Sequence, residues 1–301
     1  MTGPGTRTHE PSSQAAPIAY VFAVGRAGDA LEEVARRVVG QDGAVVRVVN
    51  DGGLGALVCD VPDDRFGEEG MKAQMEDLAR LEVVARAHHD VVAGAYDHTT
   101  VLPMRLATVY LDDSRVAGML AERGGEFHAL LSQLEGQVEW GVKVYADPRE
   151  AAAAAAAPAA DPATTSPGRA YLQQRRMSRR NHQQAFRAAG AVVGRITEAA
   201  LGLASARVAH RPQQGELATG SGENIANDAY LVPAERGQEF RETVSRLGED
   251  TPGVRVEVTG PWAPYSFATP PARAERTPEQ QPLPAQGQEG AGTAAGGVDG
   301  R

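Results

Sequence analysis

The sequence predicts an α+β fold built from two ferredoxin-like, or split βαβ, modules that are joined by a helix and flanked by disordered tails. Two observations support this prediction. Apolar residues at positions 18–110 follow the order strand, helix, strand, strand, helix, strand, and positions 138–258 repeat that order. A βαββαβ order is typical of an antiparallel sheet that carries two helices on one face.

Composition favours a cytoplasmic globular protein. The 301 residues include 42% hydrophobic residues, which suffices for two modest domains. The net charge of -9 disfavours nonspecific nucleic-acid binding, which depends on clustered Lys and Arg. No apolar run reaches the length of about 18 residues that a membrane span needs, and residues 1–17 lack the apolar centre of a secretory signal. The single Cys59 excludes an intramolecular disulfide.

The N-terminal module, residues 18–111, is expected to begin with a strand at 18–24. A helix follows, in which Asp29 caps the N-terminus and Glu32 completes a capping box. Residues 50–53 tolerate positive φ angles and predict a tight hairpin. The remaining elements of this module are strands at 44–49 and 54–61, one helix at 71–95 and a β-rich run at 99–110.

Two further helices show apolar residues at three- and four-residue steps, so each should bury one face. The expected inward residues of the helix at 71–95 are Met71, Met75, Leu78, Leu81, Ala85, His88, Val92 and Ala95. A connecting helix at 112–137 should bury Val116, Met119, Leu120, Phe127, Leu130, Leu131 and Leu134.

The C-terminal module, residues 138–267, opens with a strand at 138–145 in which Val138, Trp140, Val142 and Val144 alternate with polar or small residues. An Ala- and Pro-rich insertion at 147–168 follows it. The other elements are a long helix at 170–204, strands at 206–211, 225–232 and 254–258, and a helix whose first turn contains Pro233 and whose inward residues are Phe240, Val244 and Leu247. Residues 1–17 and 268–301 are Pro-, Gly- and polar-rich and are expected to be disordered.

Five arginines make the start of the long helix basic, because no acidic residue lies among them: Arg175, Arg176, Arg179, Arg180 and Arg187. Four interpretations are open. The arginines form a solvated helix face, pair with the acidic residues of 112–139, bind an acidic partner protein, or bind nucleic acid.

The segment 261–267 carries three aromatic residues in a chain with 5% aromatic content: Trp262, Tyr265 and Phe267. Its prolines exclude a regular helix, so the rings are expected to dock on a surface. That surface belongs either to the chain's own module or to a partner.

The sequence predicts neither an enzyme nor a cofactor or metal site. The glycines at 25–28 follow a strand and precede a helix, but they match neither dinucleotide nor P-loop spacing. His88, His89, Asp90, Asp97 and His98 have metal-ligand chemistry, yet His88 and His89 point about 100° apart on a helix, and the spacing of zinc-binding helices is missing. A hydrogen-bonded core histidine is the simpler interpretation of His88. The serines show no nucleophile-elbow motif.

Five stretches of the chain carry distinctive motifs. They are Val-Leu-Pro-Met-Arg-Leu-Ala-Thr-Val-Tyr at 101–110, Val-Glu-Trp-Gly-Val-Lys-Val-Tyr at 138–145, Gly-Arg-Ala-Tyr-Leu-Gln at 168–173, Asn-Asp-Ala-Tyr-Leu-Val at 227–232 and the segment 260–267. In this order, the motifs resemble the GvpF/GvpL family of gas vesicle proteins. Leu106 and Ala107 stand where the family is expected to carry Phe-Gly. The resemblance covers residues 18–267.

The resemblance implies a gas vesicle accessory or minor structural protein. Its expected partners are the hydrophobic shell subunit GvpA and other accessory Gvp proteins, without a membrane, and its expected location is the cytoplasm and the gas vesicle. The residues expected to meet the partner are Arg175, Arg176, Arg179, Arg180, Trp262, Tyr265 and Phe267. The alternatives are a nucleic-acid-binding regulator that uses the helix at 175–187, or a small-molecule enzyme.

Overall fold

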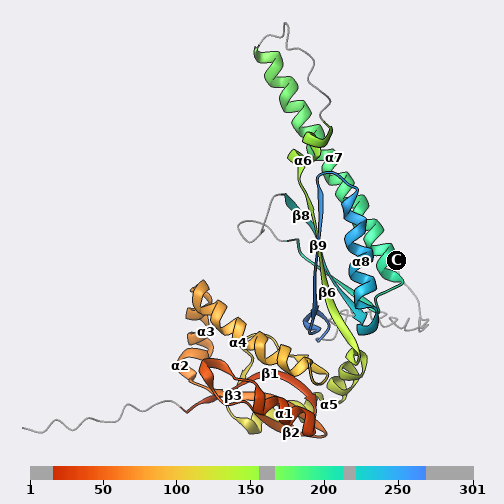
Figure 1. Ribbon diagram of the computed structural model, residues 1–301. Coiled ribbons are helices and arrows are strands. Elements are labelled where there is room, and N and C mark those ends of the chain that lie inside the picture. Colours follow the sequence, from red (N-terminus) through yellow and green to blue (C-terminus); the bar gives the residue numbers. More distant parts are fainter. Residues whose placement is uncertain (1–15, 156–166, 213–221, 269–301) are drawn as a thin grey trace, which may run out of the picture. The chain divides into compact units, whose positions relative to one another are not determined.

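The computed structural model describes residues 16–155, 167–212 and 222–268, and it confirms the α+β class with two antiparallel sheets (Figure 1). The described residues all belong to one compact unit, Met1–Thr269. Most of the predicted tails and the central part of the insertion at 147–168 lie outside the described residues. The division into modules at residues 111 and 138 therefore stays a prediction from the sequence.

The N-terminal sheet has the strand order β2-β3-β1-β4, and a short fifth strand also pairs with β1. All pairs are antiparallel, and β1 lies inside the sheet with Tyr20 opposite Cys59 of β3. The predicted hairpin joins β2 to β3 through Gly52 and Gly53, whose φ angles of 54° and 81° suit a tight turn. The strands are β1 (Ile18–Arg26), β2 (Arg47–Asp51), β3 (Leu54–Val61), β4 (Val101–Pro103) and β5 (Val109–Tyr110).

Two predictions about helix boundaries in this region are wrong. Helix α1 (Asp29–Arg37) has Gly28 at its N-cap and no side-chain cap, so Asp29 and Glu32 do not form a capping box. The helix expected at 71–95 is broken into α3 (Glu68–Met75) and α4 (Leu78–Tyr96). The break occurs because Asp77 Oδ1 accepts hydrogen bonds from the N–H groups of Ala79 and Arg80 and starts a new helix.

The break changes which residues of this stretch are buried. Met75 and Leu78, which were expected to face inward, lie at the break and are exposed. Val84, His88, Val91, Val92 and Ala95 form the buried face of α4. A short helix, α2 (Asp63–Phe66), precedes α3, and a 3-10 turn, η1 (Gln41–Gly43), precedes β2.

The run at 99–110 is also not one strand. Residues 104–108 leave the sheet between β4 and β5, although Met104 N–H and Thr108 C=O still pair with the backbone of β1. Ala107 adopts a φ of 63°, and the N–H and hydroxyl of Thr108 both donate to Arg105 C=O. This local turn replaces the ladder that alternating residues would otherwise form.

Both faces of the N-terminal sheet are covered, whereas the sequence predicted helices on one face only. Residues of α1 and α4 pack on the face that carries Tyr20 and Phe22. Helix α5 (Asp113–Leu134), capped by Asp112, packs on the face that carries Val21 and Val24. All seven residues expected on its apolar side are buried. The same core includes Leu231 of the second sheet. Helix α5 therefore packs against residues of both sheets and does not only connect them.

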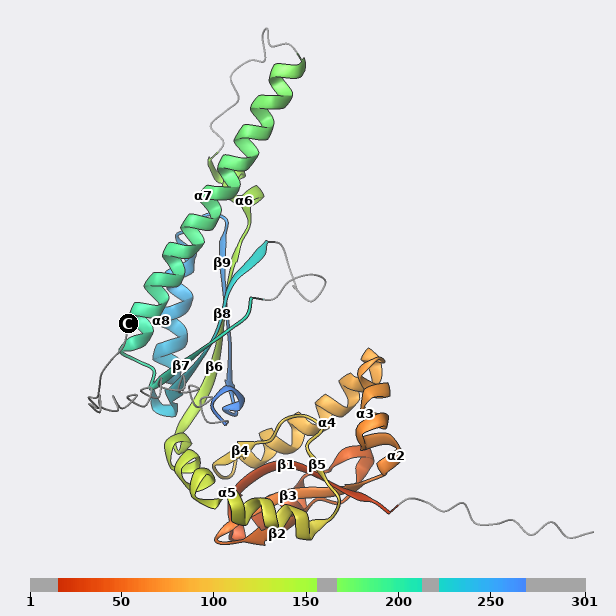
Figure 2. The same cartoon turned by 180° about the vertical axis from the view of Figure 1, so that it is seen from behind.

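The C-terminal sheet has the strand order β7-β8-β6-β9, which repeats the connectivity of the first sheet (Figures 1 and 2). Trp140, Val142 and Val144 face α7 and α8, as the period-2 pattern predicted. The first sheet departs from a simple split βαβ unit through β5, α2 and α3. The elements are β6 (Gln137–Ala146), α6 (Pro148–Ala155), α7 (Pro167–Leu201), β7 (Ala206–His210), β8 (Glu223–Pro233), η3 (Ala234–Arg236), α8 (Gly237–Glu249), β9 (Val254–Trp262) and η4 (Tyr265–Phe267).

Within the described ranges, none of the helices combines the length and the apolar character needed to cross a bilayer.

Candidate partner-binding surfaces

Helix α7 is packed over its C-terminal half only. Its buried residues begin at Ala185 and continue at Ala189, Val192, Ile196 and Ala200, a three- and four-residue spacing that faces the second sheet. Continuing that stripe toward the N-terminus leads to polar residues such as Ser178 and then to Tyr171, which is 61% exposed, so the described residues of this half form no buried apolar face. Residues 168–184, which we call the basic tip, include no buried side chain among those described. Figures 1 and 2 show this half of α7 extending past α8.

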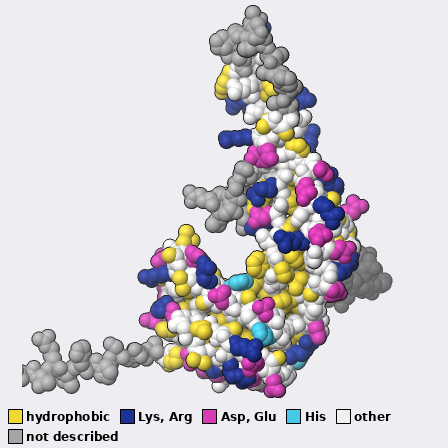
Figure 3. Space-filling view, viewed as in Figure 1, with side chains coloured by type: hydrophobic (Ala, Val, Ile, Leu, Met, Phe, Trp, Pro, Cys, Tyr) yellow, Lys and Arg dark blue, Asp and Glu magenta, His cyan; other side chains and the backbone are white. Residues whose placement is uncertain are grey.

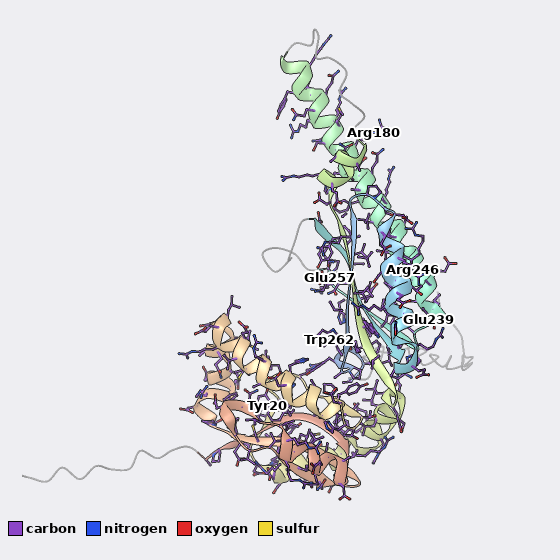
Figure 4. The ribbon with its side chains drawn as sticks, in the orientation of Figure 1. Tyr20, Arg180, Glu239, Arg246, Glu257 and Trp262 are labelled. Carbon is purple, nitrogen blue, oxygen red and sulfur yellow. The ribbon has the colours of Figure 1, made fainter. Side chains whose placement is uncertain are left out.

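The basic tip carries four of the predicted arginines, Arg175, Arg176, Arg179 and Arg180, and all four are exposed. Arg187, one turn inside the packed half, is exposed as well. Figure 4 shows Arg180 on the part of α7 beyond α8. None of the ion pairs found between described residues involves these arginines.

Pairing of these arginines with the acidic residues of 112–139 was one of the open interpretations, and the structure contradicts it. Asp113 lies 2.7 Å from Arg47, Glu126 lies 2.5 Å from Arg123, and Glu135 lies 3.3 Å from Arg26. These carboxylates therefore form ion pairs with arginines of α5 and of the first sheet, and not with the arginines of α7.

Exposed apolar side chains share the basic tip with the arginines. Tyr171, Leu172 and Met177 are between 55% and 63% exposed. Sequence reasoning missed them because Leu172 and Met177 lie off the three- and four-residue stripe of α7, and polar residues separate Tyr171 from its buried part. The tip thus offers cationic and apolar groups together, which Figure 3 shows as dark blue and yellow side chains along this helix. That mixture suits a partner with an apolar and acidic surface.

The aromatic segment docks on the chain's own unit through part of its side chains. Phe267 is buried with residues of α5 and Leu231, and Ala263 is buried against the face of the first sheet that carries Tyr20 and Phe22. Phe267 was expected to meet a partner, but its placement gives it a packing role. Trp262 stays 45% exposed and Tyr265 36% exposed, and their rings lie 5.8 Å from His89 and 6.3 Å from His88.

Glu139, on the strand predicted to open the C-terminal module, fastens the aromatic segment. Its carboxylate accepts hydrogen bonds of 2.8 Å from both the N–H and the hydroxyl of Ser266. Because the hydroxyl hydrogen of Ser266 points to Glu139, the 3.0 Å contact with His210 Nε2 requires an N–H on that ring atom. Burial raises the pKa of Glu139 despite these hydrogen bonds. By binding Ser266, Glu139 of this strand fixes the position of the segment that carries Trp262 and Tyr265.

A groove lies beside the exposed face of Trp262. One cavity of about 500 Å³ is lined by Trp262, Ala263, Val138, Tyr96 and His89 among others. A second cavity of about 750 Å³ along α8 shares Val138, Ala234 and Pro261 with the first, so the two cavities lie next to each other. We call the pair the aromatic groove. Figure 3 shows hydrophobic side chains gathered here beside histidines, and Figure 4 places Trp262 at the end of β9.

His88 is a core residue whose two ring nitrogens are both used. Nε2 lies 3.1 Å from Met104 C=O and so carries the hydrogen, while Nδ1 accepts from the Tyr20 hydroxyl at 3.0 Å. The same hydroxyl accepts from the N–H of Ala107. Burial lowers the pKa of His88 to about 4 and raises the pKa of Tyr20 to about 12. This chain of hydrogen bonds holds the turn at 104–108 against β1.

The histidines do not assemble a metal site within the part of the chain that the structure describes, where no group of three or more His, Cys, Asp or Glu side chains is placed to hold an ion. His98 instead contacts Arg37 at 3.0 Å and Gly94 C=O at 2.9 Å. His89 lines the aromatic groove beside Trp262.

Comparison with known proteins decides the family. A family model described as gas vesicle synthesis protein GvpL/GvpF matches residues 18–269. The chain belongs to this family. Gas vesicle protein L of Streptomyces sp. (strain CB03234) is 41% identical over 249 residues, which cover 83% of this chain and 92% of that protein. Gas vesicle protein F of the same strain is 28% identical over 267 residues, covering 82% and 98% of the two chains.

Solved structures of GvpL/GvpF proteins share the fold. The crystal structures of GvpF from Anabaena sp. PCC7120 and from Microcystis aeruginosa each match with a TM-score of 0.58 at 18% identity. They cover 84% of this chain and 96% and 99% of their own chains. Family membership implies association with gas vesicles and interaction with other gas vesicle proteins. Neither named relative is described as an enzyme.

Proposed function

We propose that this chain is an accessory or minor structural protein of the gas vesicle that binds the hydrophobic shell subunit GvpA and assists nucleation or assembly of the shell in the cytoplasm. The match of the GvpL/GvpF family model across residues 18–269 carries this proposal. Other accessory Gvp proteins are the second group of expected partners. The chemistry of the two exposed surfaces supports the proposal.

The two surfaces suit different stages of capture. The basic tip creates a positive potential that steers an acidic part of a client toward the chain, through the exposed arginines Arg175, Arg176, Arg179 and Arg180. Trp262 and Tyr265 then provide apolar contact at the aromatic groove. Phe267 supports this contact indirectly, because it anchors the segment that carries both rings.

The contribution of Trp262 can be estimated from its exposed area. A Trp side chain presents about 250 Å² when fully exposed, so a 45% exposed ring leaves about 110 Å² for a client. Burying that area at about 25 cal/mol per Å² contributes about 2.7 kcal/mol, or roughly 90-fold in affinity as an upper value. One aromatic side chain therefore makes a measurable difference.

Co-purification of the shell subunit tests the proposal. Recovery with the wild-type chain is compared with recovery by the Arg175→Glu/Arg176→Glu/Arg179→Glu/Arg180→Glu variant and by Trp262→Ala. We expect both variants to recover less shell subunit. Equal recovery with the four-arginine variant would contradict the steering role, and no recovery with the wild-type chain would contradict shell-subunit binding itself.

The exposed arginines also support a second candidate, a regulator that binds nucleic acid through the helix at 175–187. Five arginines on one helix that form no ion pair with another described residue offer positive charge to phosphates, although the net charge of -9 of the whole chain opposes nucleic-acid binding. Retention of DNA or RNA at physiological salt, lost in the four-arginine variant, would support this candidate. The absence of retention would dispose of it.

A further inference from the structure

The chain carries an acidic surface that matches the basic tip. It comprises the end of β3, helices α2 and α3, and the first residue of α4, residues 60–78, and we call it the acidic corner. Seven acidic residues lie there against two basic ones, Arg65 and Lys72. Asp63, Asp64, Glu68, Glu69 and Glu76 are exposed, and none of them joins an ion pair with another described residue.

The acidic corner also exposes apolar side chains at its centre. Met75 and Leu78 are 60% and 77% exposed, because Asp77 breaks the helix between them and turns their side chains out of the core. Glu76 lies between them in sequence. An isolated exposed apolar residue is ordinary, but two large ones framed by unpaired carboxylates form a patch that a basic and apolar surface would cover.

The basic tip is the complement of this patch in charge and in composition. It carries no acidic residue and five arginines, namely Arg169 and the four at 175, 176, 179 and 180. Its exposed apolar residues are Tyr171, Leu172 and Met177. Both surfaces are free of covering side chains in the described structure, so neither satisfies the other within one copy.

We propose that the basic tip of one copy of this chain docks on the acidic corner of a second copy. The arginines pair with Glu69, Glu76 and their neighbours, and Tyr171 and Met177 cover Met75 and Leu78. Because the two surfaces differ, the contact is heterologous, and a chain of copies always ends in one free tip and one free corner. Repetition of the contact produces head-to-tail oligomers, whose length grows with concentration and shrinks with salt.

This contact gives the arginines a second partner beside the proposed shell subunit. The test uses the purified chain alone, without the shell subunit. If the chain does not self-associate, the proposed function is unaffected. If the chain does not bind the shell subunit, the proposed self-contact is unaffected. If both hold, self-association and client capture compete for the same helix.

Sedimentation velocity of the full-length chain over a wide concentration range, at low and at high salt, measures the contact. The tip variant is Arg175→Glu/Arg179→Glu, and the corner variant is Glu69→Arg/Glu76→Arg. All four side chains are exposed, so both variants should fold, which thermal melting checks. Arg115→Glu/Arg241→Glu changes the net charge as much as the tip variant does, at two exposed arginines outside the basic tip and the acidic corner, and serves as the matched control for self-association.

We expect concentration-dependent oligomers of the wild-type and control chains at low salt. Each variant alone should weaken association at least about tenfold, because like charges then face each other. An equal mixture of the tip and corner variants should restore association, since each reversed surface meets an opposite charge on the other variant. A monomeric wild type at low salt, or a mixture that associates no better than its components, would overturn the proposal.

Discussion

Lowering the pH from about 8 to about 5 should destabilise this protein through His88. The folded state holds the ring neutral, with a pKa of about 4, whereas an unfolded histidine titrates near its ordinary value of about 6.5. Below about 6.5 the unfolded state therefore binds a proton that the folded state excludes, and the free energy of unfolding falls until the pH reaches about 4.

The structure sets the size of this effect. A pKa difference of about 2.5 units corresponds to about 3.4 kcal/mol once the pH is below both values, and about 2 kcal/mol of this is already lost at pH 5. Burial, which leaves His88 3% exposed, is the main cause, and the hydrogen bond to Met104 C=O only partly opposes it. Glu139 acts in the opposite direction, because its raised pKa stabilises the folded state as the pH falls.

Comparison with His88→Gln isolates the histidine. The Gln amide can donate to Met104 C=O and accept from Tyr20, but it does not titrate in this range. Urea unfolding of both proteins at pH 8 and pH 5 gives the free energy of unfolding at each pH. Glu139 and the other histidines contribute equally to both proteins and cancel in the difference. Identical pH dependence of the wild type and the variant would refute the assignment of a neutral, buried His88.

Three further substitutions test the packing around the candidate surfaces, each by urea unfolding. Phe267→Ala should lower the free energy of unfolding by about 3–5 kcal/mol, because its ring is buried against α5, whereas Trp262→Ala should lower it by much less; equal effects would contradict the division into anchor and exposed ring. Asp77→Ala should remove the cap of α4 at a cost of about 1 kcal/mol, and no change would argue against the helix break. Tyr20→Phe should cost about 1–3 kcal/mol by leaving His88 Nδ1 and the Ala107 N–H without a partner, and an unchanged stability would mean that water replaces the hydroxyl.

Elements with strong periodicity could be predicted from the sequence. The strand at 138–145 and helix α5 are both found, and all seven predicted inward residues of α5 are buried. The Gly52-Gly53 hairpin was predictable because few other residues adopt positive φ angles so readily. The break at Asp77 and the turn at 104–108 were missed, since a side-chain cap and a local hydrogen bond outweighed an otherwise continuous pattern.

The sequence by itself determined the α+β class, the repeated strand order, the family resemblance and the existence of a basic helix and an aromatic segment. These follow from local patterns of apolar residues, charge and glycine, which each stretch carries alone. The tertiary structure decided which of these groups remain available. Phe267 is buried by contact with α5, far away in sequence, while Arg175 and its neighbours are exposed because the apolar stripe of α7 ends at Ala185.

Exposure depends on what other segments cover, and no local pattern records that. The same reason explains why Met75 and Leu78 were expected in the core and lie instead on the acidic corner. A partner-binding surface is therefore the feature of this chain that its sequence predicts least well. The sequence shows which residues are basic, acidic or aromatic. The packing of α5, α7 and β6 determines which of them are exposed.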